Sequence, residues 1–170
     1  MPVRRITKHG ETVLKTPCAP VDFEKIKAEL PDLLRDMWAT MQSVRGVGLA
    51  APQIGLSYRL CVIDVRPEGK SQKLVLINPE ILSLAGELND EEGCLSVPGI
   101  YHKLRRHARA RVRALDENGV SRELAGEGLL ARAFQHEIDH LDGKLYVDRL
   151  PFEAKLKVLD EIKKAKTGWD

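Results

Sequence analysis

Residues 128–143 read GLLARAFQHEIDHLDG, and their spacing predicts a helix that is apolar on two sides. The two apolar stripes consist of Leu130, Phe134, Ile138 and Leu141, and of Leu129, Ala133, His136 and His140. A helix with two apolar faces is expected at the centre of a fold, since each face needs a packing partner. Gly143 follows as a left-handed C-cap.

The same stretch carries candidate catalytic residues. His136 and His140 are four residues apart, so a helix presents both rings on one side. An HxxxH pair alone is more often two satisfied core histidines than a metal site. Glu137 changes that balance, because it projects to the same side and can take a proton from water. HExxH on a helix therefore favours a metallohydrolase.

Two histidines leave such a centre incomplete, because catalytic zinc-type sites usually have three protein ligands. No histidine follows His140, which argues against HExxHxxGxxH, whereas Glu153 and Glu161 stay possible from a later helix. Residues 92–98, EGCLSVP, are expected to form a loop between strands and carry Cys94. A cysteine there is more often a small buried apolar residue, so the residues alone leave the third ligand open.

The segments before the central helix alternate between helical and strand patterns. Residues 23–44 are expected to be helical after an Asp22 N-cap, although Pro31 fits only the first turn and leaves the start open. Strands are predicted at 59–65 and 73–82, and a hairpin at 109–124. Asn118 and Gly119 would supply the positive φ angles of its tight turn.

A final amphipathic helix is expected after Pro151. The predicted fold is α+β, with antiparallel β-sheets packed around the central helix, an N-terminal helix and a C-terminal amphipathic helix. We expect residues 1–170 to form a single catalytic domain.

Composition limits the setting. Hydrophobic residues make up 43% of the 170 and charged residues 31%, and the net charge is +2, as in a globular protein without dominant attraction to nucleic acid or membrane. MPVRRITKHG lacks an apolar signal core, and no apolar run approaches the ~18 residues of a membrane span. The three cysteines, Cys18, Cys61 and Cys94, form no CxxC and fit reducing conditions. We therefore expect a cytoplasmic protein.

A third motif, GVGLAAPQIG, occupies residues 46–55. Its first two glycines, Gly46 and Gly48, leave room for another backbone to approach, and the Gln53 amide could donate to a developing oxyanion. The simpler interpretation is a tight strand and turn. A nucleotide loop is disfavoured, because neither GxGxxG nor GxxxxGK[ST] is present.

In this order, GVGLAAPQ, EGCLS and QHEIDH resemble the motifs of the peptide deformylases, and the resemblance covers nearly the whole chain. It implies that Cys94, His136 and His140 bind one divalent metal, Fe²⁺, which Zn²⁺, Ni²⁺ or Co²⁺ can replace. It implies that Glu137 is the general acid and base, and that Gln53 and the Leu95 backbone N–H form an oxyanion hole. The residues that it assigns to substrate binding are Gly46, Val47, Gly48, Leu49, Glu92, Gly93, Tyr101 and Ala133.

By the same resemblance, the reaction is hydrolysis of the N-formyl group from the initiator methionine of nascent chains, with release of formate. The N-formylmethionyl peptide would lie extended along residues 46–49, with Arg132 at the rim of the methionine pocket. Two departures leave contacts beyond the first residue open: Arg45 where many members have Glu, and Ile100–Tyr101 where many have an Arg. Arg106 is expected to pair with Asp139.

Parts of the sequence are also compatible with two other functions. A zincin-like endopeptidase would use the same metal chemistry on internal peptide bonds. An RNA-binding module is suggested by KLRRHARARVR at 103–113, but the alternation indicates a solvated sheet face and no aromatic residues interleave. These basic residues and the lysines of the last helix could make an accessory, transient contact with the ribosome. No DNA or membrane partner is expected.

Overall fold

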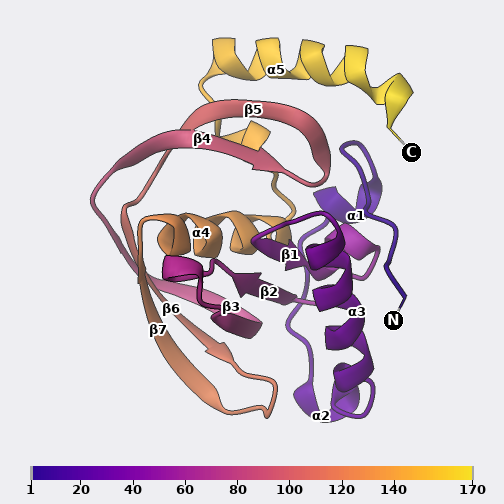
Figure 1. Ribbon diagram of the computed structural model, residues 1–170, viewed down its shortest axis with the longest axis vertical. Coiled ribbons are helices and arrows are strands. Elements are labelled where there is room, and N and C mark those ends of the chain that lie inside the picture. Colours follow the sequence, from indigo (N-terminus) through magenta and orange to yellow (C-terminus); the bar gives the residue numbers. More distant parts are fainter. Residues whose placement is uncertain (1, 170) are drawn as a thin grey trace.

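The structure is a computed structural model that describes residues 2–169. Five α-helices and seven strands form within this range (Figure 1): α1 (Thr12–Lys15), α2 (Phe23–Ile26), α3 (Leu30–Ser43), β1 (Gly48–Ala50), β2 (Leu60–Asp64), β3 (Lys73–Ala85), β4 (Leu88–Cys94), β5 (Val97–Arg106), β6 (Arg109–Leu115), β7 (Ser121–Glu127), α4 (Leu129–Leu141) and α5 (Phe152–Ala165).

The strands form two antiparallel sheets. One sheet has five strands in the order β1-β2-β3-β6-β7, and the other is the β4-β5 hairpin. Figure 1 shows α4 running between the two sheets, with α5 across the far side of the hairpin. The predicted α+β fold, with antiparallel sheets around the helix that carries HExxH, is confirmed.

Helix α4 is central because both of its sides are covered. Phe134 and Ile138 pack with Ile63, Leu76 and Val112 of the five-stranded sheet. A fully buried side chain of this size contributes roughly 1.5–3 kcal/mol to folding, so this face fixes the helix firmly. The opposite side of α4 carries polar groups that contact the β4-β5 hairpin.

The predicted N-terminal helix is two helices. Asp22 caps the first, α2, by accepting a hydrogen bond from Glu24 N. Pro31 lies in the first turn of α3, where its missing N–H leaves no helical bond unmade. The longer helix therefore begins at Leu30, one residue before Pro31. The sequence alone had left this boundary open.

The turn between β6 and β7 is longer than predicted. Gly119 has a φ of 78°, but Asn118 does not have a positive φ, so this is not the two-residue turn expected. The Asp116 carboxylate accepts hydrogen bonds from the backbone N–H groups of Asn118 and Val120 and holds the loop. The predicted alternation in β6 is confirmed, with Arg109, Arg111 and Arg113 exposed on one face.

The β4-β5 hairpin was missed by the sequence prediction. Cys94 ends strand β4 instead of lying in the loop predicted at 92–98, and only Leu95 and Ser96 separate the two strands. Residues 103–113 are likewise not one solvated face, because they span the end of β5 and most of β6, which belong to different sheets. Arg106, at the end of β5, is buried.

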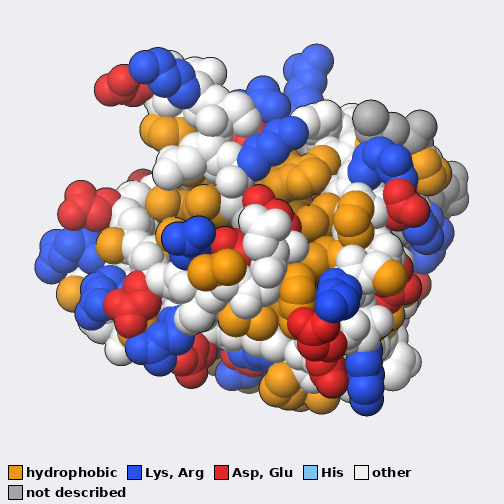
Figure 2. Space-filling model, turned by 90° about the horizontal axis from the view of Figure 1, so that it is seen from below, with side chains coloured by type: hydrophobic (Ala, Val, Ile, Leu, Met, Phe, Trp, Pro, Cys, Tyr) orange, Lys and Arg blue, Asp and Glu red, His pale blue; other side chains and the backbone are white. Residues whose placement is uncertain are grey.

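The face formed by α2, the start of α3 and the β6-β7 turn carries a shallow apolar groove. Its lining includes Phe23, Leu34 and Trp38, and a Cβ at Gly119 would touch the Phe23 ring. Figure 2 shows this end of the molecule from below, with hydrophobic side chains gathered over the middle of the face between charged groups. Among the described residues, no helix combines the length and the apolar character needed to cross a membrane.

Candidate metal centre and active site

Three potential metal ligands converge between α4 and the end of β4. The ligand atoms of Cys94, His136 and His140 lie within 4.8 Å of one another. Nε2 of His140 lies 3.4 Å from the Cys94 Sγ and 3.1 Å from Nε2 of His136. A tetrahedral ion with bonds of 2.0–2.3 Å to nitrogen and sulfur separates its ligands by about 3.3–3.6 Å. The donor set therefore fits a first-row divalent ion.

The sequence had also allowed Glu153 or Glu161 as the third ligand. Both are exposed on α5 and do not belong to this cluster. Helix periodicity brings the two histidines together, and the tight β4-β5 turn brings the thiol to them. The potential metal site thus joins residues from two of the three sequence motifs.

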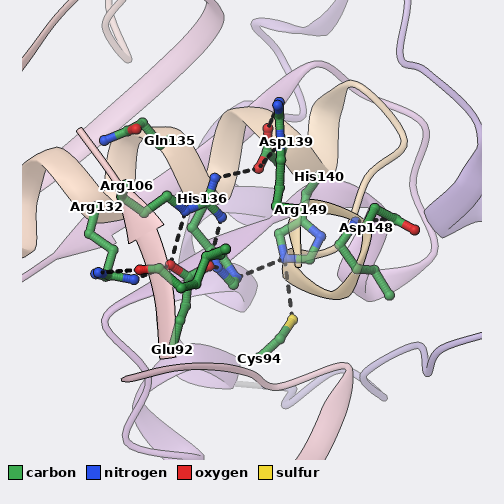
Figure 3. A network of polar contacts seen from close by, with 12 residues as sticks. Glu92, Cys94, Arg106, Arg132, Gln135, His136, Asp139, His140, Asp148 and Arg149 are labelled. Atoms are coloured by element: carbon green, nitrogen blue, oxygen red, sulfur yellow. Dashed lines mark hydrogen bonds and ion pairs between the residues drawn. The ribbon is translucent and has the colours of Figure 1, made fainter. Parts of the chain in front are cut away.

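A buried ionic network orients His136 (Figure 3). Oε2 of Glu92 lies 2.7 Å from Nδ1 of His136, and Arg106 and Arg132 each donate to the same carboxylate at 2.7 Å. Burial alone would raise the pKa of Glu92, but hydrogen bonds from His136 and Arg106 hold it well below its usual range. The ionised carboxylate favours a proton on Nδ1 of His136, which leaves Nε2 free to ligate.

The network continues along α4. Nη1 of Arg106 donates to Oδ2 of Asp139 at 2.7 Å, as predicted from the sequence, and Arg149 donates to the other Asp139 oxygen at 2.8 Å. Arg132 was expected at the rim of the methionine pocket. It does line the cleft beside the potential metal ligands, but its side chain is buried, because its guanidinium donates to Glu92 and to the Leu104 carbonyl oxygen.

Glu137 lies beside strand β1, in the space that Gly48 leaves open. A methyl group at Gly48 would lie 2.9 Å from Cδ of Glu137. Oε2 of Glu137 is buried and has no hydrogen-bond partner within residues 2–169. Burial raises the pKa of Glu137 to about 7, which is the range suited to a general base near neutral pH.

Gln53 lies in η1 (Ala51–Ile54) with its amide turned toward the thiol. Its Oε1 accepts from Ala50 N at 3.0 Å, which fixes the orientation of the side chain. Its Nε2 then points at Ser96 Oγ, at 3.2 Å, and at Cys94 Sγ, at 3.6 Å. The third motif thereby places a hydrogen-bond donor next to the potential metal site.

These groups border a cleft of about 630 Å³. Of the residues predicted to bind substrate, those that line it are Gly46, Val47, Gly48, Glu92, Gly93 and Tyr101. Leu49 and Ala133 are buried and are not part of the lining. Glu92 borders the cleft, but its carboxylate is taken up by His136 and two arginines.

Other lining residues carried no signal in the sequence. Ile6, Lys8 and Trp169 lie far from all three motifs, and only the folded chain brings them to the cleft. Arg45, one of the departures noted above, also lines the cleft and has a φ of 54°, which is uncommon for a residue with a side chain.

A thiol and two imidazoles that converge, a buried carboxylate beside them and a peptide-sized cleft define a metal-dependent hydrolase. Comparisons with known proteins agree. Residues 3–155 match the model of the polypeptide deformylase family. The chain therefore belongs to the polypeptide deformylase family. This is a family of metallohydrolases that remove the N-formyl group from nascent polypeptides, and the chain is an enzyme of that class.

Individual relatives match over nearly their whole length. The peptide deformylase of Elusimicrobium minutum is 43% identical over 99% of both chains, and that of Acidobacterium capsulatum is 47% identical over 96% of both. A crystal structure of a peptide deformylase from Legionella pneumophila superposes with a TM-score of 0.89 at 44% identity, covering 98% of this chain and 96% of that one. A Synechococcus elongatus peptide deformylase solved in complex with actinonin superposes with a TM-score of 0.87 at 43% identity, covering 95% of this chain and 88% of that one.

Proposed function

We propose that Cys94, His136 and His140 hold a ferrous ion, and that Glu137, Gln53 and the Leu95 N–H carry out deformylation of N-formylmethionyl peptides beside it. The observation that supports this most directly is the buried Glu137 carboxylate, whose Oε2 has no hydrogen-bond partner within residues 2–169 and which lies on the same helix as two of the three converging ligands. When bound, a divalent ion at these ligands would acidify water and polarise the formyl oxygen.

Glu137 takes the proton from the attacking water and returns it to the leaving amine. Its burial suits both steps, because a carboxyl group with a pKa near 7 can accept and release a proton at neutral pH. The amide of Gln53 and the backbone N–H of Leu95 donate to the formyl oxygen as negative charge develops on it. The hydrogen bond from Ala50 N to Oε1 keeps the donor end of Gln53 aimed at the site.

The peptide lies extended along residues 46–48 and adds backbone hydrogen bonds in the manner of an extra strand. Four exposed apolar side chains border the cleft and suit the methionine side chain and the residues after it: Val44, Val47, Tyr101 and Leu129.

Affinity alone does not select iron, because zinc ordinarily binds one thiolate and two imidazoles more tightly than ferrous iron does. The iron assignment is carried by the family resemblance, and Zn²⁺, Ni²⁺ and Co²⁺ are expected to occupy the same ligands. We also propose that residues 1–170 act as a single catalytic domain in the cytoplasm. Buried apolar residues pack α4 against the five-stranded sheet, α3 against the same sheet, and α5 against the β4-β5 hairpin, which favours one cooperative unit.

A transient ribosome contact would bring the enzyme to emerging chains. The lysines proposed for it lie on or next to α5: Lys155, Lys157, Lys163, Lys164 and Lys166. Co-sedimentation with ribosomes should fall with added salt and with charge reversal of these lysines. Co-sedimentation that is unchanged by salt and by charge reversal would count against this contact.

The reaction is tested with protein purified without oxygen. Metal analysis should find about one divalent ion per chain, and formate should be released from formyl-Met peptides while casein stays intact. Cleavage of casein without formate release would replace the proposal with the endopeptidase alternative. If protein stripped of metal still releases formate, the ion has no role in the reaction.

A further inference from the structure

A second cavity, of about 390 Å³, lies where α1, the end of α4 and η3 (Tyr146–Arg149) meet. Its lining includes His9, Gly10, Lys15, Gly143, Lys144 and Asp148. None of these residues lines the substrate cleft. The proposed reaction uses none of them, so the cavity needs a separate explanation.

The charge around this cavity is positive. Lys15 and Lys144 line it, and Lys166 reaches it from η4 (Lys166–Gly168), since a Cβ at Gly10 would lie 2.7 Å from the Lys166 Nζ. In the described part of the chain, these three lysines form no ion pair. Three cations without partners at one small cavity make it attractive to an anion.

The other charged groups of the lining are already engaged. Arg149 donates to Asp139 at 2.8 Å, so its charge is balanced inside the protein. Asp148 accepts from Leu145 N at 2.9 Å and lies 3.5 Å from Lys155. The carbonyl end of α4 adds only about half a negative charge. One aspartate and this helix end do not offset the three lysines.

His9 supplies a second, independent observation. Its side chain is half-buried, and its Nδ1 is enclosed and has no hydrogen-bond partner within residues 2–169. Burial lowers the pKa of His9, and Lys166 and Lys15 lower it further, against an opposing effect of Asp148. When the proton of the neutral ring is on Nδ1, this nitrogen is a donor without an acceptor, which a bound anion can satisfy.

We propose that this cavity binds a phosphate group, carried as inorganic phosphate or as a phosphate monoester. Lysine ammonium groups bind phosphate as point charges, and several of them favour a dianion over a singly charged carboxylate or halide. The cavity also falls in the size range of small-molecule sites, which leaves room for an organic group on the phosphate.

Occupation of the cavity would reach the active site through one short segment. Lys8 lines the substrate cleft and His9 lines the second cavity, so residues 7–9 separate the two. His9 N donates to the Ser96 carbonyl oxygen at 2.9 Å, and Thr7 N donates to the Gln53 carbonyl oxygen at 2.8 Å. A phosphate held by His9 and the lysines would restrain the backbone that supports Gln53 and Ser96.

Binding is measured by calorimetry on the nickel-loaded protein, with inorganic phosphate and adenosine monophosphate as probes at constant ionic strength. The variant is Lys15→Gln/Lys144→Gln. Its matched control is Lys25→Gln/Lys70→Gln, since Lys25 and Lys70 are exposed and absent from both cavities. Removing two charged partners should weaken phosphate binding at least tenfold, by about 1.4 kcal/mol or more, whereas the control should stay within about twofold.

Formyl-peptide hydrolysis without phosphate should continue in both double variants, which shows that fold and metal centre are intact. Tighter binding of adenosine monophosphate than of phosphate would identify a monoester as the ligand, and equal binding would identify the phosphate group alone. Equal binding by both double variants would overturn the proposal, since Lys15 and Lys144 would then not contribute to the site. If no binding is detected at tens of millimolar phosphate, the proposal is also overturned. The same holds if a short RNA binds more tightly than both probes and its affinity falls equally in the two double variants.

Discussion

Gly48 and Glu137 share one space between β1 and α4: a methyl group on Gly48 would overlap Oε1 of Glu137 and lie 2.9 Å from its Cδ. The glycine therefore sets the position of the carboxylate, in addition to leaving a peptide room to approach the strand.

Gly48→Ala should lower kcat/KM by about 10²-fold, within the range expected when a general base is displaced. In a Glu137→Gln background, Gly48→Ala should lower kcat/KM little further, because the glycine acts through the position of the Glu137 carboxylate. Steady-state kinetics of the four proteins measures this coupling. Independent, additive losses would show that Gly48 acts on the substrate and not through Glu137.

Glu137→Gln should keep the fold and the bound metal while losing about 10²–10⁴-fold in kcat, because an amide cannot accept the proton. Metal analysis and circular dichroism provide the controls. A variant with most of the kcat of the parent protein would exclude Glu137 from proton transfer.

The role of Gln53 is better tested with glutamate than with leucine, since Oε1 also accepts a hydrogen bond from Ala50 N. Gln53→Glu keeps that acceptor and removes the donor, and kcat should fall by about 10²-fold or more. Gln53→Leu should lose a similar factor and should also unfold at a lower temperature, because it leaves Ala50 N unpaired. If only KM changed, Gln53 would be a binding residue.

Glu92→Gln should weaken metal binding by about 10–100-fold, because His136 loses the carboxylate that orients it. The protein should also lose about 3–5 kcal/mol of stability, since Arg106 and Arg132 remain buried without that countercharge. Glu87→Gln, an exposed acid just before β4, is the matched control. Metal affinity is measured by competition with a chelator. An affinity of Glu92→Gln equal to that of the control would contradict the role of Glu92.

The iron form should lose activity in air, whereas nickel or cobalt forms should persist. Mass spectrometry of the inactivated protein should find added oxygen on Cys94 in preference to the other two cysteines. Cys61 is fully buried and burial raises the pKa of its thiol, as it does for Cys18. Full activity in an air-stable protein that holds only zinc would exclude iron, and unimpaired metal binding by Cys94→Ala would exclude the thiol ligand.

The sequence predicted the parts of the fold that have a strong period. Helix α4 shows two apolar stripes, and the β6 strand alternates between exposed arginines and buried Ala110 and Val112. Strand β4 reads LNDEEGC and offers no such pattern, because it pairs only with β5 and keeps little apolar surface. The position of β4 depends on contacts with α4, which the hydrophobic pattern of the strand itself does not reveal.

The site was predictable where chemistry lies within one motif, as for His136, Glu137 and His140. The role of Glu92 was not, since the carboxylate meets its partners across 14 residues to Arg106, 40 to Arg132 and 44 to His136. The contribution of Lys8 and Trp169 to the cleft depends in the same way on tertiary contacts alone.

The thiol of Cys94 and the imidazole of His140 are 46 residues apart in the chain, one at the end of a hairpin strand and the other on a helix. Closing a loop of that length carries an entropic cost that local structure does not offset, so we expect the ligand set to be completed late in folding. The ion would then be captured by a nearly native chain, and chelators present during refolding should slow the final step more than the formation of either sheet.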